Sequence, residues 1–235
     1  TVVAVAEAAL HRSLEESRVV LTVPQGGSVA ISDEGMRFAT TGEDGTATVW
    51  ATNTGRRLLT LRGHKGGVNG IAYSPDGSLL ATTGHDRTVR LWDAASGRQI
   101  HVLRGHRKVV LGVAFSPDGS LLATSSRDGT VRIWDVAMGT QHLVLRGSPG
   151  EPFYSFSGLT PAFSPDGSRV TSGGWKSTPI WDLATGKISM TLPRQKWPAF
   201  AVALSDDGTR VATDVHLDVK KWDEQSGKRL TTLSG

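Results

Sequence analysis

Five tryptophans recur along the chain at spacings of 42, 42, 47 and 41 residues, and this periodicity limits the fold more than any other feature. They are Trp50, Trp92, Trp134, Trp181 and Trp222. A period of this length is typical of a chain built from copies of one structural unit. Every copy also carries a four-residue turn sequence that ends in glycine, and these turns begin at Ser32, Ser74, Ser116, Ser164 and Ser205.

Each turn sequence predicts a hairpin, because aspartate bonds back to the chain and glycine accepts a positive φ, and in the three middle copies proline also presets φ. In the second copy we expect strands at residues 68–74, 79–83, 88–92 and 99–103. A four-stranded sheet this small cannot bury both of its faces alone, so the copies must stack on one another. The sequence therefore predicts an all-β propeller of five four-stranded antiparallel blades, with repeats at about 25–63, 64–105, 106–147, 148–194 and 195–235.

The ends of two repeats resemble the WD40-repeat family. Gly63-His64 with Trp92-Asp93, and Gly105-His106 with Trp134-Asp135, match its Gly-His and Trp-Asp dipeptides, and the resemblance covers residues 18–235. It implies a hydrogen-bonded set of side chains that ties each blade together. The residues at these positions are His64, Thr83, Asp86 and Trp92 in the second blade and His106, Ser125, Asp128 and Trp134 in the third, with the hydroxyl residue open by one position.

Ser125, His106 and Asp128 are also the ingredients of a nucleophilic triad. Catalysis would require an exposed hydroxyl, an oxyanion hole and a substrate cleft, so we favour the structural interpretation.

The other three repeats depart from this pattern. Gln25, Ser148 and Gln195 replace the histidine, and the fourth repeat has an insertion through residues 148–157. In the family, the loops before the first strand and the turns between the second and third strands open on one face of the disc. We therefore expect an aromatic cluster on that face, formed by Phe153, Tyr154, Phe156, Trp175 and Trp197. These rings either recognise a partner protein or fill the gaps left by the missing ties.

Charge is distributed unevenly between the two faces, although the net charge is only +4. The same face gathers Lys65, Arg87, Arg107, Lys108, Arg127, Lys176, Arg194 and Lys196, while the opposite turns are acidic. We expect Lys65, Arg107, Lys108 and Arg127 to contact a partner, since a basic rim favours an acidic one. Nucleic acid is the disfavoured alternative, because the surplus is small and no nucleic-acid motif is visible.

The first seventeen residues have apolar side chains at helical spacing and predict a short amphipathic helix or linker (1–17) before the propeller (18–235). Residues 18–23 align with a fourth strand that lacks its first three. This orphan strand predicts an incomplete ring, with self-association to complete it, although a closed five-bladed ring stays open as an alternative.

We expect a non-catalytic interaction scaffold or sensor, because variable loops on a repeated framework are typical of recognition. The repeats and the leading helix also look like the carboxy-terminal propellers of large bacterial multidomain signalling proteins. An enzyme with a central-channel site is the least favoured alternative: the sequence has no phosphate loop, zinc spacing or nucleophile elbow. We expect no cofactor and no metal, a protein partner, no membrane segment and a cytoplasmic location, the chain having no cysteine and no long apolar run.

Overall fold

The computed structural model describes residues 27–147, 160–173, 178–193, 199, 201–205, 207, 209–215, 218–223 and 226–234. These residues form strands in five four-stranded antiparallel sheets, and no helix occurs among them. We number the sheets blade 1 to blade 5 and name the strands of each a to d in chain order. Blade 1 comprises β1 (Val29–Ile31), β2 (Arg37–Thr41), β3 (Thr46–Ala51) and β4 (Arg57–Arg62). Blade 2 comprises β5 (Val68–Tyr73), β6 (Leu79–Gly84), β7 (Val89–Asp93) and β8 (Gln99–Leu103).

Blade 3 comprises β9 (Val110–Phe115), β10 (Leu121–Ser126), β11 (Thr130–Asp135) and β12 (Thr140–Arg146). Blade 4 comprises β13 (Ala162–Phe163), β14 (Arg169–Thr171), β15 (Thr178–Asp182) and β16 (Lys187–Leu192). Blade 5 comprises β17 (Ala201–Leu204), β18 (Arg210–Val215), β19 (Asp218–Asp223) and β20 (Arg229–Ser234).

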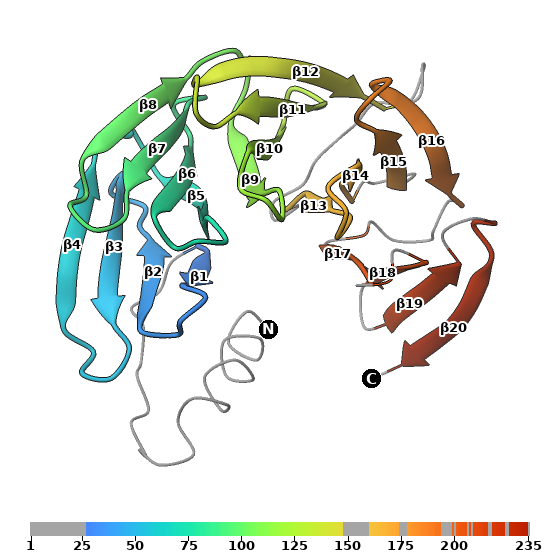
Figure 1. The fold of residues 1–235 in the computed structure, drawn as a ribbon, viewed down its shortest axis with the longest axis horizontal. Coiled ribbons are helices and arrows are strands. Elements are labelled where there is room, and N and C mark those ends of the chain that lie inside the picture. Colours follow the sequence, from blue (N-terminus) through green and yellow to red (C-terminus); the bar gives the residue numbers. More distant parts are fainter. Residues whose placement is uncertain are drawn as a thin grey trace.

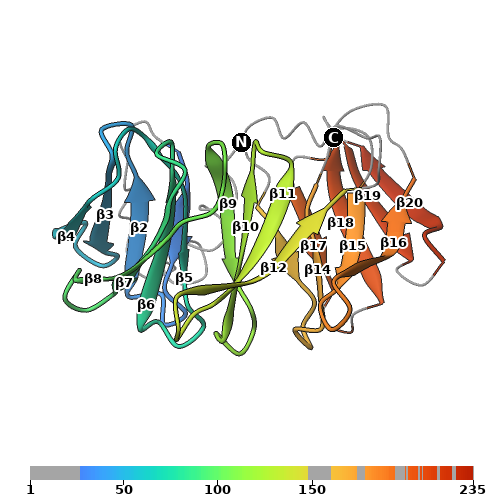
Figure 2. The ribbon, with the colours of Figure 1, turned by 90° about the horizontal axis from the view of Figure 1, so that it is seen from above.

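The five blades fan around one axis as an open arc, with blades 1 and 5 at its two ends (Figure 1). Strand a of each blade lies nearest the axis and strand d forms the outer border, and the edge-on view shows the blades standing side by side (Figure 2). The predicted incomplete five-bladed propeller is confirmed. The predicted helix at 1–17 and the orphan strand at 18–23 lie outside the described residues.

The turn between strands a and b has the geometry that its sequence predicts. In blade 2 the hydroxyl of Ser74 donates to Asp76 Oδ1 at 2.5 Å, and the amide of Gly77 donates to Ser74 O at 2.9 Å. Gly77 has a φ of 69°, a left-handed conformation that glycine adopts without strain. The same contacts repeat at Ser116 and Ser164, so these hairpins place strands a and b identically in successive blades.

Each blade has two unlike faces, and the stack always joins one kind to the other. The tryptophan face of blade 2 presents Leu80 and Trp92, and it packs against Ala39, Val49 and Leu61 on the opposite, aliphatic face of blade 1. The interfaces of blade 2 with 3, of 3 with 4 and of 4 with 5 repeat this arrangement. Because side chains alternate between the faces of a strand, the sequence period sets both faces at once.

Candidate functional site

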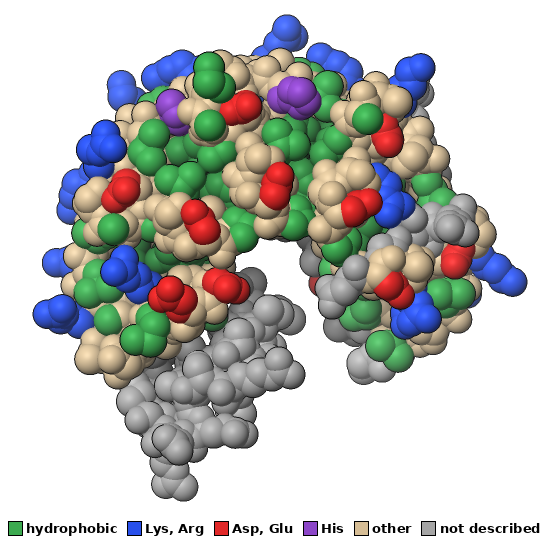
Figure 3. Space-filling view, viewed as in Figure 1, with side chains coloured by type: hydrophobic (Ala, Val, Ile, Leu, Met, Phe, Trp, Pro, Cys, Tyr) green, Lys and Arg blue, Asp and Glu red, His purple; other side chains and the backbone are tan. Residues whose placement is uncertain are grey.

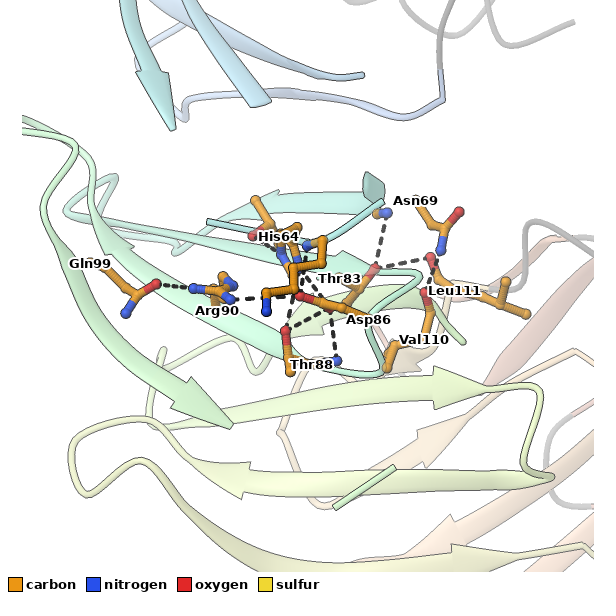
Figure 4. Close-up of polar contacts among 12 residues, drawn as sticks. His64, Asn69, Thr83, Asp86, Thr88, Arg90, Gln99, Val110 and Leu111 are labelled. Atoms are coloured by element: carbon orange, nitrogen blue, oxygen red, sulfur yellow. Dashed lines mark hydrogen bonds and ion pairs between the residues drawn. The ribbon is translucent and has the colours of Figure 1, made fainter. Parts of the chain in front are cut away.

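A polar tie joins the d–a loop, the b–c turn and the strands β6 and β7 of blade 2 (Figure 4). His64 precedes strand a, and its Nδ1 lies 2.9 Å from Asp86 Oδ1 in the turn between strands b and c. Its Nε2 lies 2.8 Å from the hydroxyl of Thr82 on β6, which also accepts a hydrogen bond from Trp92 Nε1 at 2.9 Å. The tie therefore spans the blade from its d–a loop through β6 to the tryptophan of β7.

Blade 3 repeats the tie with almost the same distances. His106 Nδ1 lies 3.0 Å from Asp128 Oδ2, and His106 Nε2 lies 2.8 Å from Thr124 Oγ1. Trp134 Nε1 donates to the same hydroxyl at 2.8 Å, and the two rings meet edge to face with centroids 6.1 Å apart. The structure thus brings together the predicted histidine, aspartate and tryptophan of both blades.

The predicted hydroxyl residues are wrong by one position. Thr82 and Thr124 join the ties in place of Thr83 and Ser125, because the pairs Leu80–Trp92 and Leu122–Trp134 put alternate residues of strand b on the tryptophan face. Thr83 lies on the other face, where its hydroxyl accepts from Gly70 N at 3.0 Å and donates to Leu111 O in blade 3 at 3.2 Å (Figure 4). Thr83 therefore links two blades.

Ser125 also lies outside the tie. Its hydroxyl is fully buried and accepts a hydrogen bond from Gly112 N at 3.1 Å. A nucleophile must be within reach of a substrate, so this serine with His106 and Asp128 does not form the catalytic arrangement considered above.

The hydrogen-bond pattern assigns the histidine tautomer. The Asp86 carboxylate can only accept, so His64 Nδ1 carries the imidazole hydrogen and donates to it. Nε2 of the neutral ring then accepts from the Thr82 hydroxyl, whose oxygen accepts from Trp92 Nε1. Burial lowers the pKa of His64 below its ordinary value of 6.5, and the nearby Asp86 only partly opposes this effect. The pKa of His106 is lowered for the same reason, so both rings are neutral in the folded chain at pH 7.

Both tie aspartates remain ionised. Burial raises the pKa of Asp86, but hydrogen bonds from His64, from the Thr88 hydroxyl at 2.7 Å and from Lys65 N at 3.1 Å outweigh burial and hold the pKa at about 2. In blade 3 the same competition lowers the pKa of Asp128, with bonds from Thr130 and from Arg107 N. Each carboxylate is saturated by donors and is not free to bind a ligand.

Further members of the ties follow from the repeat but were missed by the sequence analysis. Thr88 and Thr130 stand two residues after the aspartates and bond to them. Arg90 lies against Asp86, with 3.6 Å between Nη2 and Oδ2, and donates to Gln99 on β8. Gly63 faces this guanidinium: an added Cβ would lie 2.7 Å from Arg90 Nη1, so the glycine of the Gly-His dipeptide makes room for the arginine. Their recurrence at a fixed distance from Trp92 and Trp134 was the available signal.

The remaining blades keep parts of the tie. The indole nitrogens of Trp50 and Trp222 donate to Thr40 and Thr213, each at 3.0 Å. In blade 4, Trp181 Nε1 donates instead to Arg146 O at 3.1 Å. Ser172 occupies the position of Thr124 there, and its buried hydroxyl has no hydrogen-bond partner among the residues that the structure describes. The predicted loss of the tie in blade 4 is reflected in this unpaired group.

The predicted partner-binding residues fall into two sets. Phe153, Tyr154, Phe156, Trp175 and Trp197 lie outside the described residues. Lys65, Arg107, Lys108 and Arg127 are described, and all four are exposed in the d–a loops and b–c turns of blades 2 and 3. On the face viewed in Figure 3, acidic side chains lie over the a–b and c–d turns, and most of the visible lysines and arginines lie along the outer border, with a few beside the acidic side chains.

Two further properties hold for the described part of the chain. It contains no cluster of three histidine, aspartate or glutamate side chains with the arrangement of a metal site. It also contains no helix with the length and hydrophobicity needed to span a membrane.

Comparison with known proteins agrees with the fold and the ties. Residues 21–51, 55–93 and 97–135 each match the family model described as WD domain, G-beta repeat. No curated protein matches the sequence. The matched repeats include both complete ties, and their sheets stack as blades of one propeller. Residues 21–135 carry three repeats of the WD40 family, and their sheets stack with the two that follow as blades of a β-propeller.

Proposed function

We propose that the chain is a non-catalytic interaction scaffold or sensor module that binds a protein partner through its d–a loops and b–c turns. WD40 repeats generally mediate protein–protein interactions, and propellers of this family are typically non-catalytic. The supporting observation is that one carboxylate holds a loop and a turn together in each of two blades. Asp86 accepts from Lys65 N, and Asp128 accepts from Arg107 N.

This arrangement separates framework from recognition. The backbone amides of Lys65 and Arg107 are fixed by the ties, while both side chains are exposed. A partner therefore meets cations whose attachment points are ordered before binding, which reduces the entropy lost on association. The predicted aromatic cluster belongs to the same face in this proposal and supplies the apolar anchors.

The proposal is tested by exchanging charges on one face at a time. Lys65→Ser with Arg107→Ser alters the proposed face, and Asp33→Ser with Glu34→Ser alters two exposed acids in the opposite a–b turn. Partners cross-linked to the wild-type chain in its own cells are quantified for both variants. We expect the first variant to lose the partner and the second to keep it. Equal retention by both variants would contradict the proposed binding face.

Self-association through blade 5 is a second proposed function, and one observation favours it. Val219 and Leu233 pair across β19 and β20 but are 42% and 64% exposed, whereas the equivalent pair Val131 and Leu145 in blade 3 is fully buried. In blades 1 to 4 this aliphatic face is covered by the tryptophan face of the next blade.

We propose that a second copy of the chain covers the aliphatic face of blade 5. Blade 1 of that copy offers a matching surface, because its tryptophan face lies at the other end of the arc and Trp50 is only partly buried. Sedimentation over a range of concentrations should show association that Val219→Asp with Leu233→Asp abolishes. Leu230→Asp, on the other face of β20, is the control. A wild-type chain that stays monomeric at every concentration would refute self-association.

A further inference from the structure

Arg87 has an uncommon backbone conformation for its residue type. Its φ is 66°, and it is the one non-glycine residue with a positive φ among the residues that the structure describes. The equivalent positions of the neighbouring blades are glycines, Gly45 with a φ of 82° and Gly129 with a φ of 80°. All three follow a tie or turn aspartate and precede a threonine whose amide bonds to that aspartate. The turn thus requires the left-handed conformation, and arginine adopts it at a cost in strain.

The side chain at this position adds charge to an already basic surface. Lys65, Arg87, Arg107, Lys108 and Arg127 are all exposed in the d–a loops and b–c turns of blades 2 and 3, and we call them the basic patch. The carboxylates in these segments are Asp86 and Asp128, which the ties bury and saturate with hydrogen bonds. The basic patch therefore has five cations against these two carboxylates and keeps a net positive charge.

The surroundings of the patch define its extent. On the blade 1 side, the exposed Glu43 and Asp44 form an acidic border, and Glu43 lies close enough to Gly67 that an added Cβ there would be 3.0 Å from its Oε2. On the blade 3 side, burial lowers the pKa of the partly buried Arg132, Asp128 opposes this effect, and the charges of Arg146 and Arg107 add to it. Among the described d–a loops and b–c turns, the exposed cations gather in blades 2 and 3.

The residue types favour a peptide over a nucleic acid. The described d–a loops and b–c turns of blades 2 and 3 contain no phenylalanine, tyrosine or tryptophan, the side chains on which single-stranded bases stack. Arginine binds a carboxylate in a bidentate fashion, which suits glutamate and aspartate side chains.

We propose that the basic patch binds an acidic peptide segment of the partner and that Arg87 is a specificity-determining residue of this contact. This inference rests on the proposed function, and it adds the chemical class of the partner that binds to the proposed face. A glycine at position 87 would relieve the strain, so the arginine is explained by what its side chain binds rather than by the fold.

The test uses fluorescence anisotropy of a labelled poly-glutamate peptide at low salt, together with thermal unfolding. Arg87→Gly should weaken binding about twofold to fivefold and raise the thermal midpoint by about 2 °C. Arg87→Lys keeps the charge but loses the bidentate contact, and its affinity should fall between those of the wild type and Arg87→Gly. Arg98→Gly removes the same charge from an exposed residue beside the c–d turn and should leave the affinity unchanged.

Three outcomes would overturn the inference. The peptide does not bind at low salt, or Arg98→Gly weakens it as much as Arg87→Gly does, or single-stranded DNA of equal charge binds more tightly and with the same dependence on Arg87. None of these outcomes decides whether the d–a loops and b–c turns are the binding face, because a partner that is not acidic could still bind there. The cross-linking comparison of the Lys65/Arg107 and Asp33/Glu34 variants tests that face separately.

Discussion

The backbone amide of Arg107 donates a hydrogen bond of 2.8 Å to Asp128 Oδ2, which joins the d–a loop of blade 3 to its own b–c turn. The same carboxylate accepts from His106, whose other ring nitrogen meets Thr124 beneath Trp134. The interior of the blade is thereby connected, bond by bond, to a loop on the surface. Changes inside the tie should alter stability, and changes at the exposed ends should alter binding.

Removal of a tie histidine should destabilise the chain. His106→Ala leaves Asp128 and Thr124 without their shared partner, which costs about 1 to 3 kcal/mol when such groups are buried. The free energy of unfolding is measured by urea denaturation. His85→Ala, an exposed residue of the blade 2 turn, is the control and should change little. Equal stability of His106→Ala and the wild type would mean that the tie contributes nothing.

The same strand position should respond differently in blades 3 and 4. Thr124→Ala removes the hydroxyl that bonds to His106 and Trp134 and should cost about 1 to 3 kcal/mol. Ser172→Ala removes a buried hydroxyl without a partner and should be neutral or slightly stabilising. Urea denaturation of both variants makes the comparison. A loss in Ser172→Ala as large as that in Thr124→Ala would contradict the assignment of the unpaired group.

The free energy of unfolding should decrease in two ranges as the pH is lowered. The pKa of both tie histidines is lowered from 6.5 in the folded chain, so the unfolded chain binds more protons as the pH drops below about 6.5, and the free energy of unfolding decreases there. Asp86, with a pKa of about 2 against an ordinary 3.8, contributes stability above pH 3.8 that is lost as the pH falls toward 2.

The measurement is urea denaturation at a series of pH values. The variant His64→Gln with His106→Gln should show a flatter pH dependence between pH 7 and about pH 5, whatever its absolute stability. A wild-type slope that the variant reproduces in that range would assign the pH dependence to other groups.

The predicted aromatic cluster gives a test of recognition against gap filling. Trp175→Ala with Trp197→Ala should weaken partner binding and leave the thermal midpoint nearly unchanged, because exposed anchors contribute to association more than to folding. Partner cross-linking and thermal unfolding are measured on the same preparation. A large drop in the midpoint would favour the structural interpretation of these rings.

The sites differ in how far the sequence could define them. His64, Asp86 and Trp92 were predictable because each repeats at a fixed distance from a turn, and the repeat reports that distance directly. The hydroxyl residue of the tie was not predictable in the same way, because Thr82 and Thr83 are adjacent in the sequence and both can form hydrogen bonds. Only the pairing of β6 with β7 assigns Thr82 to the tryptophan face and Thr83 to the contact with Leu111.

The sequence by itself determined the five-fold repeat, the four-stranded blades and the turns between them, because periodicity, glycine and proline act over a few residues. The tertiary structure decided which neighbouring blade each face meets. It left Val219 and Leu233 uncovered at the end of the arc and placed a strained Arg87 on a basic surface. These features depend on contacts between blades and on backbone angles within a turn, which a linear pattern of residue types does not specify.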